Sequence, residues 1–149
     1  MSVNPAAEPG LVFYVLESAD AHSRERFLAK LLLKIQQQQR RADVRFETQE
    51  QAERFNQIAW QQPADRYLGH SLAGTLPSRI LLHGPELIKP QQDVLINLHP
   101  ELYPEFERFQ RTIEVLDQSP ERIEPGRERW RQYKQQGFTP VVHKIANTD

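Results

Sequence analysis

The sequence predicts an α/β fold: a single Rossmann-like domain with a mostly parallel central sheet and helices on both faces. Short apolar runs typical of strands alternate with segments of helical periodicity along the chain, and this alternation favours β-α-β units. A length of 149 residues suits one domain with one core. We expect that domain over 11–145, after a flexible N-terminus (1–10) and before a polar tail (146–149).

The opening strand and helix have the clearest patterns. Leu11 to Leu16 is rich in β-branched and aromatic residues and follows Gly10, as expected of a buried strand. Helical spacing of apolar residues begins at Ser23, which is placed to cap the helix, and the polar segment Gln36 to Arg41 ends it. These patterns predict the first β-α unit.

A second unit follows directly. Ala42 to Glu47 alternates enough to be a strand, and Thr48 is placed to cap the next helix. The apolar residues that this helix turns toward the core are Ala52, Phe55, Ile58 and Ala59. From Gln61 to Ser78 there is no clear periodicity, and a connection of this length in a compact domain is often functional.

Three more strands are expected in the second half. Arg79 to His83 and Asp93 to Leu98 are separated by a turn containing Gly and Pro, and Arg111 to Leu116 follows a short helical segment from Tyr103 to Phe109.

The last elements are a helix and an edge strand. The helix runs from about Pro120 to Gln136, and Gly137 stands where a helix C-cap belongs. Phe138 to Ile145 then adds a strand at the edge of the sheet.

The composition limits the classes of function. Nineteen Lys and Arg face twenty Asp and Glu, a formal net charge of -1, which argues against the broad basic field of a duplex-DNA binder. Cysteine is absent, which excludes disulfides, thiolate metal clusters and a cysteine nucleophile. No secretion signal is visible, and the apolar runs fall far short of the ~20 residues that span a bilayer. We expect a cytoplasmic protein without a membrane partner.

Catalytic motifs are missing from the sequence. The first strand-to-helix turn has no phosphate-binding glycines, and the segment from Gly69 to Gly74 lacks the Lys of a P-loop. The five histidines show no zinc-binding spacing, and no serine stands in a nucleophile elbow. We therefore expect no enzymatic activity, no cofactor and no metal. A nucleotide-dependent α/β enzyme with an unrecognised site stays open as an alternative.

The final helix combines basic and apolar residues on one arc. At about 100° per residue the arc contains Ile123, Arg127, Trp130, Arg131 and Lys134. The helix's glutamates lie on a different arc, so we expect an unneutralised basic stripe. Such a face suits a peptide that presents carboxylates beside a hydrophobic anchor.

Two other interpretations of this arc remain open. Trp130 and Ile123 can instead pack into the core while the arginines reach water from its edge. The arc can also be a platform for single-stranded nucleic acid, because Arg contacts phosphates and Trp stacks on bases.

A second candidate group opens the long connection. It consists of Trp60, Pro63, Tyr67 and Leu68, whose apolar and aromatic side chains can anchor a partner peptide. The alternative is that Trp60 ends its helix and covers the core.

Five segments, in order, resemble the DNA polymerase III chi subunit family over roughly Leu11 to Lys144. They are Val12-Phe-Tyr-Val-Leu16, Trp60-Gln-Gln-Pro-Ala-Asp-Arg-Tyr67, His70-Ser-Leu-Ala-Gly74, Asp93-Val-Leu-Ile-Asn-Leu98 and Arg127-Glu-Arg-Trp-Arg-Gln-Tyr-Lys-Gln-Gln-Gly-Phe138. The family pattern differs at three positions, which here hold Asn56, Gly69 and Ile123.

The resemblance implies a Rossmann-like accessory subunit of the polymerase without a nucleotide site. It implies that Arg127, Trp130 and Arg131, with Lys134 and Ile123 beside them, bind the acidic-hydrophobic C-terminal tail of single-stranded DNA-binding protein. It also implies a contact with the psi subunit, and through psi with the clamp loader. That contact falls on Trp60, Pro63, Tyr67, Leu68 and His70. A helicase is an alternative partner at this surface, and contact with DNA is mainly indirect.

Overall fold

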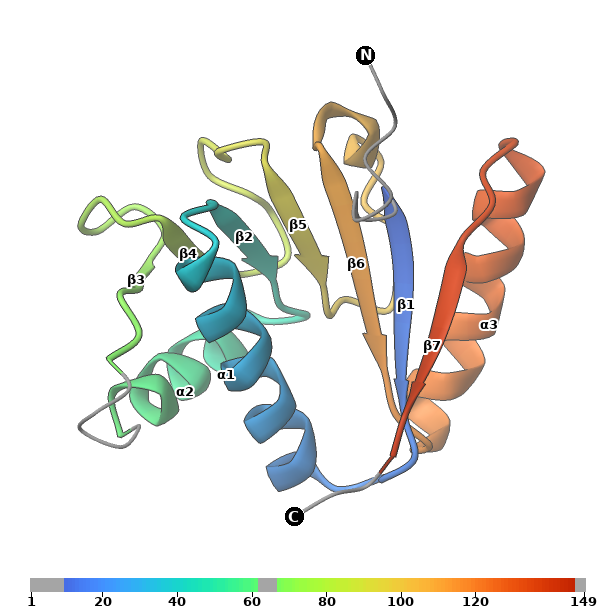
Figure 1. The fold of residues 1–149 in the computed structure, drawn as a ribbon, viewed down its shortest axis with the longest axis horizontal. Helices are drawn as coiled ribbons and strands as arrows, with labels where there is room; N and C mark the ends of the chain where they lie inside the picture. The colour runs from blue at the N-terminus through green and yellow to red at the C-terminus, as the bar shows by residue number, and fades with distance from the viewer. Residues whose placement is uncertain (1–9, 62–66, 147–149) are drawn as a thin grey trace.

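The computed structural model describes residues 10–61 and 67–146 and shows an α/β fold built on a seven-stranded sheet (Figure 1). The strands are β1 (Leu11–Leu16), β2 (Ala42–Arg45), β3 (Ser71–Leu72), β4 (Ile80–His83), β5 (Val94–Asn97), β6 (Arg111–Leu116) and β7 (Val141–Ile145). Their order across the sheet is β3-β4-β2-β5-β6-β1-β7, and every neighbouring pair is parallel. The predicted fold class is confirmed.

Helices cover the two faces of this sheet. They are α1 (Ala21–Gln37), α2 (Gln49–Trp60) and α3 (Pro120–Gln135), with a short 3-10 helix η1 (Phe106–Arg108). Leucines of α1 and aromatic and alanine residues of α2 pack in one core cluster, whereas Tyr133 of α3 and Phe106 of η1 pack in a second cluster on the opposite face. Figure 1 shows α1 in front of the sheet and α3 beside the edge strand β7.

Side chains alternate along β1 between the two core clusters. Val12 and Leu16 point into the α1 and α2 side, and Leu11 and Phe13 point into the α3 side. Each fully buried aliphatic or aromatic side chain of this kind stabilises the fold by about 1.5–3 kcal/mol. Strand β1, like β5 and β6, therefore contributes to both halves of the core.

Of the two predicted N-terminal helix caps, one is confirmed and one is wrong. Thr48 caps α2, since its hydroxyl accepts a hydrogen bond from the backbone N–H of Gln51 at 3.1 Å. Ser23 does not cap α1: that helix begins at Ala21, and the Asp20 carboxylate accepts from the Ser23 N–H at 2.9 Å. A carboxylate three residues upstream satisfies a free N–H of the first turn as well as a hydroxyl would. On α2, Ala52, Phe55 and Ala59 are buried as predicted, while Ile58 is only partly buried.

The segment from Gln61 to Ser78 differs from the expected irregular loop. It contains β3, a two-residue strand that pairs with β4 at the edge of the sheet. A strand of two residues is too short to produce an alternating pattern in the sequence. The edge strand expected in 138–145 is confirmed as β7, which pairs with β1. The segments predicted to be flexible or polar tails, 1–10 and 146–149, lie almost wholly outside the described residues.

Across residues 10–61 and 67–146, none of the helices has the length and apolar character needed to cross a membrane.

Candidate partner-binding sites

Helix α3 is attached to the sheet by a buried polar network around Glu114 of β6. The Glu114 carboxylate accepts from Arg129 Nε at 2.9 Å, from the Tyr133 hydroxyl at 2.7 Å and from Asn97 Nδ2 at 3.1 Å. All four side chains are buried. A fully satisfied network of this kind has one geometry, so it fixes the rotation of α3 about its axis.

Burial and hydrogen bonding have opposite effects on the pKa of Glu114. Burial raises the pKa of Glu114, while the Arg129 guanidinium and the hydrogen bonds from Tyr133 and Asn97 lower it. Burial also raises the pKa of the Tyr133 hydroxyl, which therefore stays a donor to Glu114. Arg129 reaches further, with Nη1 donating to the Pro100 carbonyl at 2.8 Å.

The start of α3 is fixed in a similar way. Asp117 accepts hydrogen bonds from the Ser119 N–H and hydroxyl, and Arg24 of α1 pairs with its carboxylate at 2.6 Å.

Farther along α3, a Cβ on Gly126 would lie only 2.4 Å from the Leu116 side chain. A glycine is thus what lets α3 lie so close to β6.

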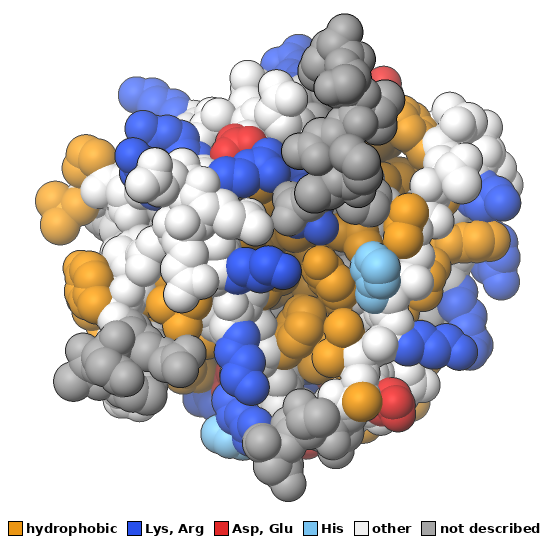
Figure 2. All heavy atoms as spheres, in the orientation of Figure 1, with side chains coloured by type: hydrophobic (Ala, Val, Ile, Leu, Met, Phe, Trp, Pro, Cys, Tyr) orange, Lys and Arg blue, Asp and Glu red, His pale blue; other side chains and the backbone are white. Residues whose placement is uncertain are grey.

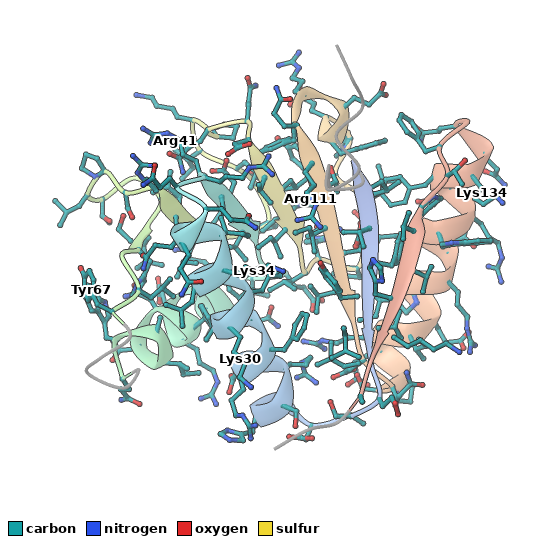
Figure 3. The ribbon with its side chains drawn as sticks, in the orientation of Figure 1. Lys30, Lys34, Arg41, Tyr67, Arg111 and Lys134 are labelled. Carbon is teal, nitrogen blue, oxygen red and sulfur yellow. The ribbon has the colours of Figure 1, made fainter. Side chains whose placement is uncertain are left out.

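The opposite face of α3 is exposed and basic. Trp130 keeps 37% of its surface accessible, and the Lys134 ammonium lies 5.0 Å from the centre of its ring. Arg127 and Arg131 are exposed beside it. Lys and Arg side chains gather along the edge of the molecule formed by α3 in Figure 2, and Figure 3 labels Lys134 on this helix. The predicted basic and aromatic residues therefore share one surface, which we call the α3 outer face (Arg127, Trp130, Arg131 and Lys134).

One expectation about this face was wrong. The basic stripe is not unneutralised, because Arg127 pairs with Glu124 at 2.8 Å and Arg131 with Glu128 at 3.0 Å. Residues three apart on a helix are neighbours even when they lie on different arcs. Ile123 packs against the core cluster under α3, which agrees for this residue with the alternative interpretation of the arc.

The second predicted group lies at the end of α2. Trp60 is the last residue of the helix and is 54% exposed, and its ring lies 6.1 Å from that of Tyr67 and 4.5 Å from that of His70. The Gln36 side chain holds this segment to α1: it donates to the Tyr67 carbonyl at 2.8 Å and accepts from the Gly69 N–H at 2.7 Å. Trp60 and Tyr67 form an exposed aromatic pair on a fixed backbone, the Trp60 surface.

The other residues predicted for this surface lie elsewhere. Leu68 is 1% exposed and belongs to the core. His70 is buried beneath Trp60, where its Nδ1 lies 2.7 Å from the Leu68 carbonyl oxygen. Both therefore support the surface from below. Pro63 lies outside the described residues.

The α3 outer face and the Trp60 surface lie at opposite ends of the molecule. Figure 3 shows Tyr67 and Lys134 on opposite sides, and the sheet separates them. The two surfaces therefore have no residues in common.

A third surface was missed by the sequence analysis. Between α1 and β7, the Tyr14 ring stacks on His143 with centroids 5.7 Å apart and meets the Phe27 ring edge-on at 5.5 Å. Lys30 and Lys34 are exposed on α1 beside these rings, and Figure 2 shows apolar side chains gathered in the middle of this face. The signal was the i, i+4 spacing of the two lysines, but the pairing of β7 with β1 cannot be inferred from it.

Within the part of the chain that the structure describes, no three His, Asp or Glu side chains come together in a way that could hold a metal ion.

Comparisons with known proteins agree with this architecture. The model of the family described as "DNA polymerase III chi subunit, HolC" matches residues 9–141. Among solved structures, the fold is similar to that in "The crystal structure of T4 UvsW", with a TM-score of 0.62 and 9% sequence identity. The similarity covers 91% of this chain and 41% of that one, and at such low identity it concerns the fold alone. A search of curated protein sequences gave no match.

Proposed function

We propose that this chain, which belongs to the DNA polymerase III chi subunit (HolC) family, is an adaptor that binds two replication proteins at opposite ends of its sheet. Its accessory role in DNA polymerase III follows from the family. The proposal adds the partners: the acidic-hydrophobic tail of single-stranded DNA-binding protein on the α3 outer face, and psi, which leads to the clamp loader, on the Trp60 surface.

One observation supports the tail-binding half above all others. Trp130 is exposed on a helix whose inner face is fixed by Glu114, with Lys134 over its ring and Arg127 and Arg131 exposed on the same helix. An aromatic ring supplies apolar contact area for a hydrophobic terminal residue, and guanidinium groups bind carboxylates in two-pronged fashion. In the bound complex the tail's carboxylates replace Glu124 and Glu128 as partners of the two arginines.

Fluorescence anisotropy with a labelled acidic peptide that ends in a hydrophobic residue tests this half. Arg127→Glu should weaken binding by roughly tenfold or more, and binding by the wild type should fall as salt rises. Arg108→Glu is the matched control, because Arg108 is also exposed and paired to a glutamate three residues away, Glu105 at 3.2 Å. Equal loss in both variants, or none in either, would contradict the site.

The psi-binding half rests on the Trp60 surface, where two large aromatic side chains are exposed next to each other. Trp60→Ala should lose psi in co-purification and keep the tail peptide, whereas Trp130→Ala should do the reverse. A single variant that loses both partners while remaining folded would contradict two separate sites.

Direct binding of single-stranded DNA is the second candidate. The observation that favours it is the third surface, where Tyr14, Phe27 and His143 supply rings for base stacking and Lys30 and Lys34 supply charge. It predicts salt-sensitive affinity for an oligonucleotide in the absence of any protein partner, abolished by the double change Lys30→Glu and Lys34→Glu. No affinity at low salt would exclude this function.

A further inference from the structure

A cavity of about 250 Å³ opens at the carboxyl edge of the sheet. It lies beside the ends of the neighbouring strands β2 and β5. After β2 the chain continues to α2 on one face of the sheet, and after β5 it continues to η1 on the other face. Phe46 and Leu98, the residues that directly follow these two strands, line the cavity. Crevices at this reversal point are where parallel α/β sheets bind ligands, although the glycine loop that would hold a nucleotide is missing here.

Cationic and apolar side chains make up most of the lining, which also includes Glu25 and Gln51. Arg24 of α1, Arg54 of α2 and Arg122 of α3 contribute guanidinium groups, while Phe46 and Phe55 contribute rings whose centroids are 5.9 Å apart. Each arginine comes from the first or second turn of its helix. Three guanidinium groups near the N-terminal ends of their helices therefore line the same space, which favours an anion.

The three arginines differ in their partners. Arg24 pairs with Asp117 at 2.6 Å, and Arg54 pairs with Glu25 at 3.0 Å. The Arg122 guanidinium makes no hydrogen bond or ion pair with any described residue. Burial, followed by repulsion from Arg24, lowers the pKa of Arg122, although the carboxylates of Asp117, Glu121 and Glu47 act in the opposite sense. A partly buried guanidinium without a hydrogen-bonded partner costs free energy that a bound anion would recover.

We propose that this cavity binds a small oxyanion carried on an aromatic ring, an aryl phosphate or an aryl carboxylate, with Arg122 contacting the oxyanion. The ring lies on the apolar floor formed by Phe46, Phe55 and Leu98. The volume is slightly below the range of about 300–1,000 Å³ for pockets that hold drug-sized ligands, so the ligand is a single ring with its charged group. This site is separate from both partner surfaces of the adaptor, so neither proposal depends on the other.

Titrations of the full chain with phenyl phosphate and with benzoate, followed by thermal unfolding and calorimetry, test the proposal. At least one of the two should raise the unfolding midpoint in a saturable way, and the stronger one identifies the head group. Inorganic phosphate and phenol, which are the halves of phenyl phosphate, should each bind more weakly than the whole. Absence of a saturable effect with both aryl probes would overturn the site.

Arg122→Gln distinguishes a ligand-binding role from a structural one. The substitution should lower the affinity for the tighter-binding probe by roughly tenfold or more, because charge-assisted hydrogen bonds are lost. The control variant Arg108→Gln should bind this probe as the wild type does. Without a probe, Arg122→Gln should be at least as stable as the wild type, since an unpaired and partly buried charge is removed. Unchanged probe binding, or a marked fall in stability without probe, would assign Arg122 a structural role and overturn the proposal.

Discussion

Each face of α3 has an arginine paired with a glutamate, but the two pairs have different roles. On the inner face, Arg129 meets Glu114 at 2.9 Å, with 4% and 0% of the two side chains exposed. On the outer face, Arg127 meets Glu124 at 2.8 Å, with 62% and 69% exposed. The distances are nearly equal, and only the surroundings differ.

The surroundings decide what each pair can do. Water and salt weaken the outer pair, so an incoming carboxylate can take the place of Glu124 at little cost. The inner pair is buried from solvent, and its geometry is fixed by Tyr133 and Asn97. One face therefore holds the helix in place, and the other is free to exchange partners.

Arg129→Met should give the largest effect on stability. It removes the charge that pairs with Glu114 and leaves a buried carboxylate uncompensated, at a cost of about 3–5 kcal/mol in the free energy of unfolding. Urea denaturation measures this, with Arg127→Met as the control that changes the same residue type on the outer face. An equal loss in the free energy of unfolding of the control would show that the two faces do not differ in this way.

The buried pair at the start of α3 should make stability depend on pH. Burial raises the pKa of Asp117, but the hydrogen bonds from Arg24 and Ser119 outweigh it and the pKa is lowered overall. The stabilisation is therefore complete above the unfolded-state pKa and is lost as pH falls through the folded-state pKa. Asp117→Asn should cost about 1.5–3 kcal/mol near neutral pH.

Denaturation curves collected between about pH 7 and pH 2 check this dependence. The wild type should lose stability on acidification more steeply than Asp117→Asn does, so that the two curves converge at low pH. Parallel curves would show that Asp117 is not the group responsible.

Tyr133→Phe should have a smaller effect than either change. The Glu114 carboxylate loses one donor but keeps Arg129 and Asn97, and the ring still fills the core cluster, so we expect a loss of about 1 kcal/mol. Phe106→Leu, in contact with the same ring, is the packing control. A loss as large as that of Arg129→Met would mean that the hydroxyl, and not the guanidinium, holds the helix.

Much of this fold was predictable because local patterns determine it. The apolar run at 11–16 and the helical spacing after it correspond to β1 and α1 within two residues, since periodic burial and secondary structure share one cause. The strand β3 was not predictable, because its two residues are ordered by pairing with β4 and not by their own pattern.

The site was predictable only in part for a related reason. Periodicity placed Arg127, Trp130 and Arg131 on one helix, but it did not show the pairing with Glu124 and Glu128 that the three-residue spacing allows. The inner pair was missed altogether, because Glu114 lies on a strand and Arg129 on the following helix, and only the packing of α3 on the sheet brings them together.

The smallest expected effect on stability tests the outer face alone. Glu124→Gln and Glu128→Gln each remove an exposed ion pair worth less than about 0.5 kcal/mol, so the fold should be nearly unaffected. They also free Arg127 and Arg131 from their competitors, and the affinity for the acidic tail peptide should rise by roughly two- to fivefold per change at low salt. Glu105→Gln, which frees Arg108 in the same way, is the matched control and should leave the affinity unchanged. If affinity falls in the two test variants, the glutamates contribute to the bound state, and the outer face resembles the inner one more than its exposure suggests.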